Sequence, residues 1–292
     1  MTISKITVLL LAFTLLRTGA AWACVGSRPL AMGGAFIGLA DDANATYWNP
    51  AGLAQLPSQS ATGTWMHTSS NRDKINYQDY ASFATAFDTS KLAKKMAFGV
   101  SYIQDDTVID VAGTRVADTE KWYWASFAAD TGKYGMLGIN VRKTDDDALG
   151  SSIDSEMGID ASWFYRVNDQ LTIGALAQDV NAPEVKAIGI GKTNRIRNYR
   201  AGLAFRPKPG MVVTLDGYDL ADNGGAQSAR FGIEKQYGTL ALRAGYYGVG
   251  SNFDQGATFG VGWKKQGYTI DATLLSGDFD NTVLISGSFQ VM

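Results

Sequence analysis

Hydrophobic and polar side chains alternate with a period of two from about residue 60 to the C-terminus. The clearest stretch covers residues 156–167, where Met157, Ile159, Ala161, Trp163, Tyr165 and Val167 alternate with Glu156, Gly158, Asp160, Ser162, Phe164 and Arg166. Successive side chains of a β-strand point to opposite faces of a sheet, so this pattern predicts strands with one apolar face. The same division recurs at residues 198–206, 239–247 and 255–264.

Fourteen segments of this kind follow one another, and an even number is typical of a closed antiparallel barrel. We expect strands at residues 60–68, 79–88, 95–104, 122–130, 134–142, 154–167, 171–180, 198–206, 211–220, 228–237, 239–247, 255–264, 268–275 and 281–291. Tight turns at 131–133, 168–170, 207–210, 238 and 265–267 alternate with longer connections at 105–121, 143–153 and 181–197. This rhythm favours an all-β, 14-stranded antiparallel transmembrane β-barrel over a soluble sandwich.

Composition agrees with a wall that faces lipid on one side. The chain has 292 residues, of which only 18% are charged and 33 are glycine, whereas a soluble domain carries about 25% charged residues. Its mean hydropathy is close to neutral at −0.08. The longest apolar stretch, residues 8–16, is too short for the roughly 20 residues of a membrane-spanning helix. The chain therefore fits neither an ordinary soluble enzyme nor a helical membrane protein.

The reactive side chains exclude several kinds of chemistry. With one His and one Cys, the chain offers no His-rich or Cys-rich metal site and no internal disulfide. A Ser-His-Asp centre would depend on His67 alone, and we interpret His67, beside Trp65, as an interfacial residue. The 26 basic and 28 acidic side chains lack the basic excess of a nucleic-acid binder. We expect no enzyme activity, no cofactor, no metal and no nucleic-acid partner.

Residues 1–23 have the features of a cleaved export signal. Lys5 is followed by the apolar stretch 8–16, and Ala21-Trp22-Ala23 has the small residues of a cleavage site. Cleavage there would leave Cys24 first. A lipoprotein signal remains the alternative, although Ala21 stands where such signals normally have Leu. We expect a signal peptide at 1–23, an N-terminal segment at 24–57 and the barrel at 58–292.

The segment 24–57 lacks the period-two pattern. Asp41 or Asp42 is suited to cap a short helix at 43–47, and Asn49 followed by Pro50 is a typical helix start. Its glycines permit close approach to other backbone. We therefore expect compact helical turns rather than a wall strand.

The same segment carries a recognisable string of motifs: Met32-Gly33-Gly34-Ala35-Phe36, Ala40-Asp41-Asp42-Ala43 and Tyr47-Trp48-Asn49-Pro50-Ala51-Gly52-Leu53. It resembles the N-terminal signature of the FadL-like superfamily of outer-membrane proteins, in its PorV/PorQ-like or UPF0164-type branch. The resemblance implies a 14-stranded barrel whose N-terminal segment folds into the lumen as a plug. The residues that carry this signature are Gly33, Gly34, Phe36, Asp41, Asp42, Tyr47, Trp48, Asn49, Pro50 and Gly52.

The resemblance implies two functions. One is a plugged channel for passive passage of hydrophobic or small solutes, opened by plug displacement or a lateral gap in the wall. The other is a non-transporting scaffold barrel that binds a protein partner in an envelope or secretion assembly. The expected location is the outer membrane, with its lipid as a partner in both cases. The brief outer loops and the C-terminal Phe289-Gln290-Val291-Met292 depart from the transporter pattern, in which barrels commonly end on an aromatic residue.

Charged residues on the polar faces are expected to line the lumen. They are Glu156, Asp160, Arg166, Arg200, Arg206, Arg230, Glu234, Arg243 and Asp271. We expect them to pair with one another and with Asp41 and Asp42, which closes the lumen; a substrate path is the alternative. The acidic run 145–147 is interpreted as a solvated outer loop, with divalent-cation binding as the alternative. Interfacial or lipid-facing aromatics are expected at Trp122, Tyr123, Trp124, Trp163, Trp263 and Tyr268.

Overall fold

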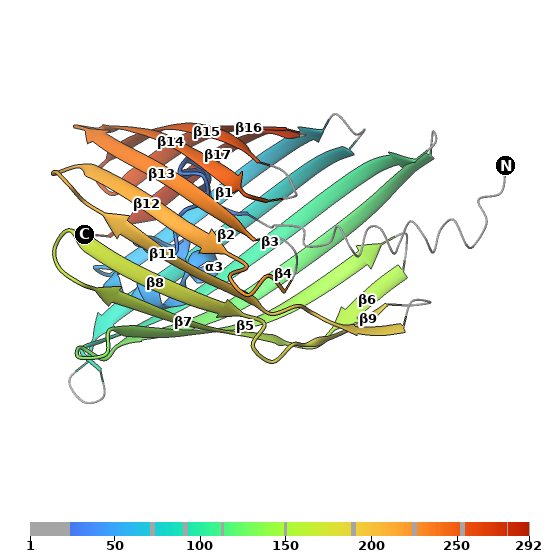
Figure 1. The fold of residues 1–292 in the computed structure, drawn as a ribbon, viewed down its shortest axis with the longest axis horizontal. Coiled ribbons are helices and arrows are strands. Elements are labelled where there is room, and N and C mark those ends of the chain that lie inside the picture. Colours follow the sequence, from blue (N-terminus) through green and yellow to red (C-terminus); the bar gives the residue numbers. More distant parts are fainter. Residues whose placement is uncertain are drawn as a thin grey trace.

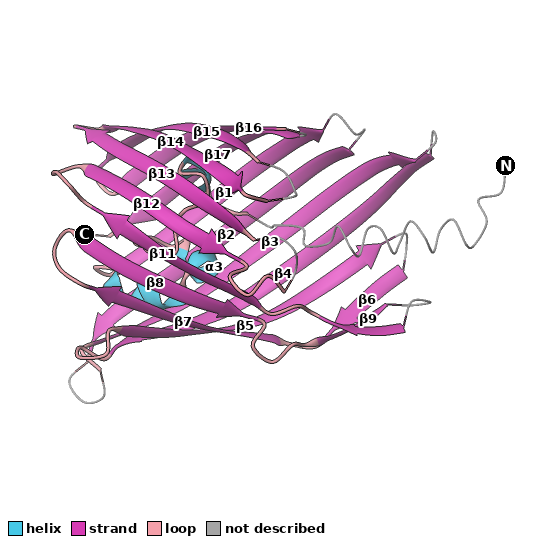
Figure 2. Cartoon of the chain, viewed as in Figure 1, coloured by secondary structure: helices cyan, strands magenta, loops and turns pink. Residues whose placement is uncertain are grey.

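The computed structural model shows a closed β-barrel with tilted strands and three short helices inside it (Figures 1 and 2). It describes residues 24–70, 74–89, 93–111, 114–148, 151–187, 191–223, 227–251, 255–278 and 280–291. The expected signal peptide at 1–23 lies outside the described residues.

Seventeen strand segments form the barrel in the described part of the chain. They are β1 (Gln59–Ser70), β2 (Lys74–Asp88), β3 (Lys95–Val111), β4 (Thr114–Asp130), β5 (Met136–Ala148), β6 (Ser151–Ser155), β7 (Gly158–Arg166), β8 (Leu171–Gln178), β9 (Glu184–Ala187), β10 (Gly191–Asn194), β11 (Asn198–Phe205), β12 (Met211–Tyr218), β13 (Ser228–Tyr237), β14 (Leu240–Val249), β15 (Gly256–Lys265), β16 (Tyr268–Gly277) and β17 (Asp280–Gln290).

These segments make fourteen wall strands. β6 and β7 both pair with β5, so together they are one wall strand with a break. The pairs β9–β10 and β8–β11 likewise show that β8 continues into β9 and β10 into β11. All neighbours are antiparallel, and β17 closes the ring on β1. The predicted closed, fourteen-stranded antiparallel barrel is confirmed.

The two ends of the barrel differ. Short connections at 131–135, 167–170, 206–210, 238–239 and 266–267 lie at one end, which we call the turn end; the opposite end is the loop end. The long outer connections expected at 105–121 and 143–153 are wrong, because strands run through most of these residues, while in 181–197 the short strands β9 and β10 take up about half of the connection. In β3 and β4 the ladder pairs Asp105 with Glu120 and Thr107 with Asp118. Backbone hydrogen bonds hold these extensions together, and they need no apolar face.

The predicted alternation of faces is present in the wall. Residues of β7 are alternately buried and exposed from Gly158 to Ser162, and the exposed members form an apolar belt around the outside. Its residues include Trp65, Phe83, Val100, Phe127, Ile139, Phe231, Val261 and Ile270. Within the described ranges, no helix is long and apolar enough to span a membrane.

The interpretation of the aromatic run 122–124 is wrong in part. Tyr123 lies outside and is 43% exposed, whereas Trp122 and Trp124 are buried inside the barrel. Adjacent residues of a strand point to opposite faces, so the three rings cannot share one environment. Trp163, Trp263 and Tyr268 lie on the outside, as expected.

The N-terminal segment, residues 24–57, contains α2 (Ser27–Ala31), α3 (Ala45–Trp48) and the 3-10 helix η1 (Pro50–Gln55). The Asn49 side chain accepts a hydrogen bond from Ala51 N, and Pro50 begins η1, as predicted. Asp42 instead accepts from Asn44 N at 2.9 Å, and no side chain caps α3. All three helices lie within the ring of strands, toward the turn end (Figure 2).

Candidate functional site in the barrel lumen

The N-terminal segment is in contact with most of the wall. Helix α2 lies against β14–β17, and η1 against β2–β5 and β7. Nearly every residue from Val25 to Leu56 is buried, including the large side chains of Phe36, Trp48 and Leu53. The candidate site is therefore the lumen: the interface between this segment and the wall, and the inner wall toward the loop end.

Inward-facing glycines allow the backbone of the segment to approach the wall closely. A Cβ at Gly138 would collide with Ala51 backbone, one at Gly174 with Ile37 backbone, and one at Gly245 with Gly33 backbone. Further inward glycines where a Cβ would meet the segment are Gly99, Gly202, Gly232 and Gly260. Contacts of this kind leave no room for even a methyl group, so wall and segment fit each other around most of the circumference.

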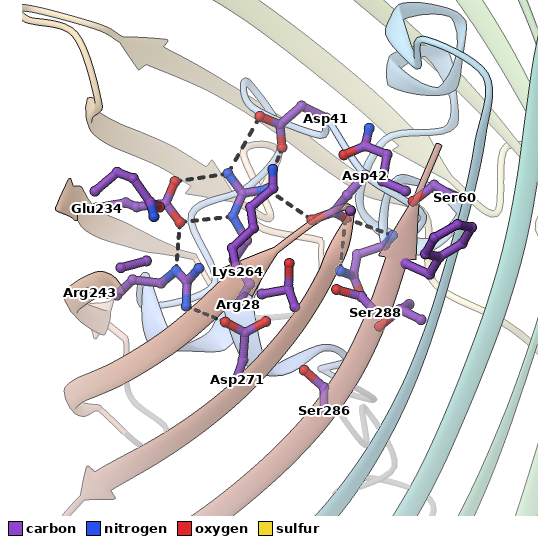
Figure 3. A pocket seen from close by; sticks show the side chains of 18 residues that line it. Arg28, Asp41, Asp42, Ser60, Glu234, Arg243, Lys264, Asp271, Ser286 and Ser288 are labelled. Carbon is purple, nitrogen blue, oxygen red and sulfur yellow. Dashed lines mark hydrogen bonds and ion pairs between the residues drawn. The ribbon is translucent and has the colours of Figure 1, made fainter. Parts of the chain in front are cut away.

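Charged groups join the segment to β13–β16 at the turn end (Figure 3). Arg28 donates from Nη1 to Asp41 Oδ1 at 2.6 Å and to Asp42 Oδ2 at 2.9 Å. Arg28 also donates two hydrogen bonds to Glu234 of β13, from Nε to Oε2 at 2.9 Å and from Nη2 to Oε1 at 3.0 Å. Arg243 then joins Glu234 to Asp271, with both ion-pair distances at 2.6 Å. The expected partners of Asp41 and Asp42 were wall arginines; the partner is Arg28 of their own segment.

A polar cavity of about 130 Å³ adjoins this network. Besides the ion-paired residues, its lining includes Thr62 and the serines Ser60, Ser286 and Ser288 (Figure 3). Burial raises the pKa of Asp42 above its ordinary value, although Arg28 beside it acts in the opposite direction. The cavity is large enough for several water molecules. On this side of the segment, the contact with the wall is polar.

Buried hydrogen bonds anchor the rest of the segment. Asp216 Oδ2 accepts from Ile37 N at 2.8 Å, and Thr172 Oγ1 donates to Gly38 O at 2.7 Å. Asn49 Nδ2 donates to Ile37 O at 2.9 Å, while Ser162 Oγ accepts from Ala51 N at 2.9 Å. Side chains of the wall and Asn49 of the segment itself thus satisfy backbone groups that would otherwise be buried without partners.

Arginine and tyrosine side chains gather on the loop-end side of the segment. Arg142 forms a buried ion pair with Asp179, whose backbone N donates to Asp160 Oδ1 at 2.9 Å. The guanidinium groups of Arg200 and Arg230 lie 4.8 and 3.8 Å from the ring centroid of Tyr218. Arg230 Nη1 is 3.8 Å from Cys24 Sγ, which places the first described residue inside the lumen.

Apolar and aromatic side chains lie on the inner faces of β17 and β1–β4, next to Arg142, which is paired with Trp124. Met66 of β1 is paired with Leu284 of β17, and Ile103 of β3 is paired with both Tyr80 and Trp122. Trp124 lies 5.3 Å from Trp122 and 5.9 Å from Tyr47 of the segment, measured between ring centroids. We call these six wall residues the apolar row: Met66, Tyr80, Ile103, Trp122, Trp124 and Leu284. All six are buried.

The predicted lumen residues fall into three groups. Asp160, Arg200, Arg230, Arg243 and Asp271 are buried on inner faces, and Glu234 is largely buried in the ion-pair network. Arg206 follows β11 and is half-buried. Glu156 lies in the break between β6 and β7, and Arg166 ends β7 at the turn end; both are exposed.

Other candidates are dispersed. The residues at 145–147 belong to β5 rather than to a loop, so Asp145 and Asp147 face outward and Asp146 inward. His67 lies on β1 beside Trp65 and Tyr77, with ring centroids 6.2 and 4.8 Å away. Within the described ranges, no group of three or more possible metal ligands comes together.

Sequence reasoning missed Arg28, Asp216 and most of the apolar row. Arg28 precedes the signature motifs, and only its distance to Glu234 identifies its role. Met66, Ile103 and Leu284 are single apolar residues on otherwise polar faces. A signal was available for these three: their parity places them on the inner face of strands whose outer face is already apolar.

Comparison with solved structures identifies barrels of the same fold. A deltaS2S3 mutant of the TodX monoaromatic hydrocarbon channel is 13% identical, with a TM-score of 0.64 over 91% of this chain and 99% of that chain. A Pseudomonas aeruginosa FadL homologue is 10% identical, with a TM-score of 0.60 over 89% and 96%. The CymD monoaromatic hydrocarbon channel is 12% identical, with a TM-score of 0.53 over 91% and 97%. No family model and no curated protein sequence matches the chain. The chain therefore has the fold of these FadL-type barrels.

Proposed function

We propose that the chain is an outer-membrane barrel of FadL-like type that passes hydrophobic or small solutes, with residues 24–57 as its plug. The apolar row is the observation that carries this proposal. Barrel interiors are usually polar, yet here six buried apolar or aromatic side chains lie on the inner faces of the adjacent strands β17, β1, β2, β3 and β4. Contact with such side chains would stabilise an apolar solute by about 25 cal/mol per Å² removed from water.

The outer belt and the solved relatives support the membrane location. Large exposed residues such as Phe127, Ile139 and Phe259 are each more than half exposed on the outside, which is costly in water and favourable in lipid. TodX and CymD are monoaromatic hydrocarbon channels. A hydrocarbon of that size is the first solute class to test.

The fit of the plug to the wall favours a path that leaves most of the plug in place. Backbone contacts at Gly138, Gly174 and Gly245 oppose displacement of the whole segment. By contrast, three adjacent wall strands are interrupted: between β6 and β7, β8 and β9, and β10 and β11. Both side-chain and backbone hydrogen bonds cross this region: Asn181 Nδ2 donates to Met157 O at 2.8 Å, and Val180 N donates to Ile159 O at 2.8 Å. A lateral gap there is the route that requires the least rearrangement.

The test is uptake of radiolabelled toluene by Gram-negative cells that lack their own hydrophobic channel. Cells that express the chain should accumulate toluene several-fold faster than cells with an empty vector. Ile103→Asn adds a polar group to the apolar row and should remove most of that gain. Thr144→Asn, inward-facing on β5 and paired with Trp122, is the matched control and should leave uptake unchanged.

Two outcomes would contradict the proposal. One is uptake no faster than with the empty vector; the other is equal loss in both variants. If the chain gives no uptake and purifies with a stoichiometric envelope protein, the result would favour the partner-binding scaffold over the channel.

A further inference from the structure

Lysine and tyrosine side chains occur in pairs around the turn end of the barrel. Lys133 Nζ lies 5.5 Å from the ring centroid of Tyr134, and Lys235 Nζ lies 5.7 Å from that of Tyr237. Lys265 is paired with Tyr268 across the ladder of β15 and β16. The three tyrosines are 67%, 59% and 59% exposed. We call these three pairs the turn-end pairs.

The turn-end pairs lie at the edge of the outer apolar belt. Trp163 of the belt donates from Nε1 to Tyr134 O at 2.8 Å, and the ring of Tyr268 is 4.7 Å from that of Phe289. Tyrosine and tryptophan rings prefer the headgroup level of a bilayer. The lysine ammonium groups beside them therefore lie at the height of lipid phosphates rather than in the lumen.

Charge is distributed unevenly between the two ends. Among described residues in or next to the turns, the carboxylates are Asp88, Asp130 and Asp169, and the cations are Lys94, Lys95, Lys133, Arg166, Arg206, Lys208, Lys235, Lys264 and Lys265. The loop-end strands carry both signs: the acids include Asp105, Asp106, Asp118, Glu120, Asp145, Asp146 and Asp147, and the cations include Arg115, Lys121, Lys143, Lys192, Arg195 and Arg197. The excess of cations over acids is therefore at the turn end, where the potential attracts anions.

We propose that the turn-end pairs bind the headgroups of anionic phospholipids in the adjacent leaflet. In each pair the lysine ammonium and the tyrosine hydroxyl can both donate hydrogen bonds to one phosphate. A lipid is favoured over an acidic protein because the tyrosines face outward from the wall, where acyl chains lie against the belt. This inference rests on the proposed membrane location and not on transport.

The experiment measures lipid selectivity of the full-length barrel in vesicles of phosphatidylcholine. Spin-labelled phosphatidylglycerol and spin-labelled phosphatidylcholine are compared by electron paramagnetic resonance. The triple variant Lys133→Gln, Lys235→Gln, Lys265→Gln removes the cations. Its matched control, Lys121→Gln, Lys143→Gln, Lys192→Gln, removes the same charge toward the loop end. For the wild type and each variant, we also measure the fraction of the barrel that stays folded in cold detergent. This separates a variant that fails to insert from an inserted variant that has lost lipid selectivity.

The wild type should prefer phosphatidylglycerol by at least about threefold at low salt, and 0.5 M salt should weaken the preference. The turn-end triple variant should fall to less than about 1.5-fold, and the control should stay at the wild-type value. Equal association of the two lipids with an inserted wild type would overturn the proposal. So would an equal loss in the control variant, or capture of a stoichiometric acidic protein by the turn-end lysines without lipid preference.

Discussion

Glu234 is the wall residue that joins Arg28 of the N-terminal segment to Arg243 (Figure 3). Its carboxylate accepts three charge-assisted hydrogen bonds, two from Arg28 at 2.9 and 3.0 Å and one from Arg243 at 2.6 Å. Glu234→Gln keeps the shape of the side chain but has one acceptor oxygen. At least one of these bonds is lost, and an amide NH₂ then faces a guanidinium group.

A hydrogen bond to a charged partner contributes about 1.5–3 kcal/mol. The side chains of Glu234 and Arg28 are only 12% and 18% exposed, so water replaces the lost bond poorly. Arg28 keeps its ion pairs with Asp41 and Asp42, so the variant loses about 2–3 kcal/mol of the free energy that holds Arg28 to the wall. If release of the plug breaks the contact between Arg28 and Glu234, release becomes about 30 to 160 times more frequent, at 1.36 kcal/mol per factor of ten.

Planar-bilayer recordings measure this directly as the frequency of conductance events per inserted barrel. Asp169→Asn removes the same charge from an exposed turn at the same end and serves as control. We expect frequent events for Glu234→Gln and rare events for both the wild type and Asp169→Asn. Events as rare in Glu234→Gln as in the control would refute the idea that this ion pair holds the plug.

Two further predictions concern stability. Gly245→Ala places a methyl group against Gly33 and Met32 backbone, whereas Gly287→Ala meets nothing within 4 Å; calorimetry should show a loss of about 2 kcal/mol or more for the first and less than about 0.5 for the second. Because burial raises the pKa of Asp42, the folded chain favours its neutral form, and its contribution to stability falls as the pH rises through that raised pKa. Asp42→Asn should therefore flatten the pH dependence of the melting temperature above the ordinary carboxylate range; an unchanged slope would show that Asp42 is not the titrating group.

Period-two patterning predicts the number of wall strands and the face of most wall residues, because a strand with one apolar face has an apolar residue at every second position. The pattern is absent where both faces of a strand are exposed to water. The paired residues Asp105 and Glu120 continue a ladder through backbone hydrogen bonds alone, so their polar sequence resembles a loop. The same reasoning explains why the strands exceed their predicted lengths at the loop end.

The candidate site is less accessible to sequence reasoning because it depends on register and packing. The expected cluster of lumen charges includes Glu234 and Arg243, which face each other across β13 and β14. That Arg28 completes this network follows only from where α2 lies in the barrel. Trp122 and Trp124 were assigned to the membrane interface from their residue type, although their parity opposes that of Tyr123. Parity is the more reliable guide within a strand, since residue type cannot distinguish a lipid-facing ring from one in an apolar lumen.

The most direct test of an apolar solute path is a crystal structure of the barrel soaked with bromobenzene. The bromine gives an anomalous signal that locates the ligand without interpretation of weak density. The account predicts a bromine peak inside the barrel, within about 4 Å of Ile103, Trp122 or Trp124. Bromine peaks only on the outer belt, with none inside the barrel, would contradict it.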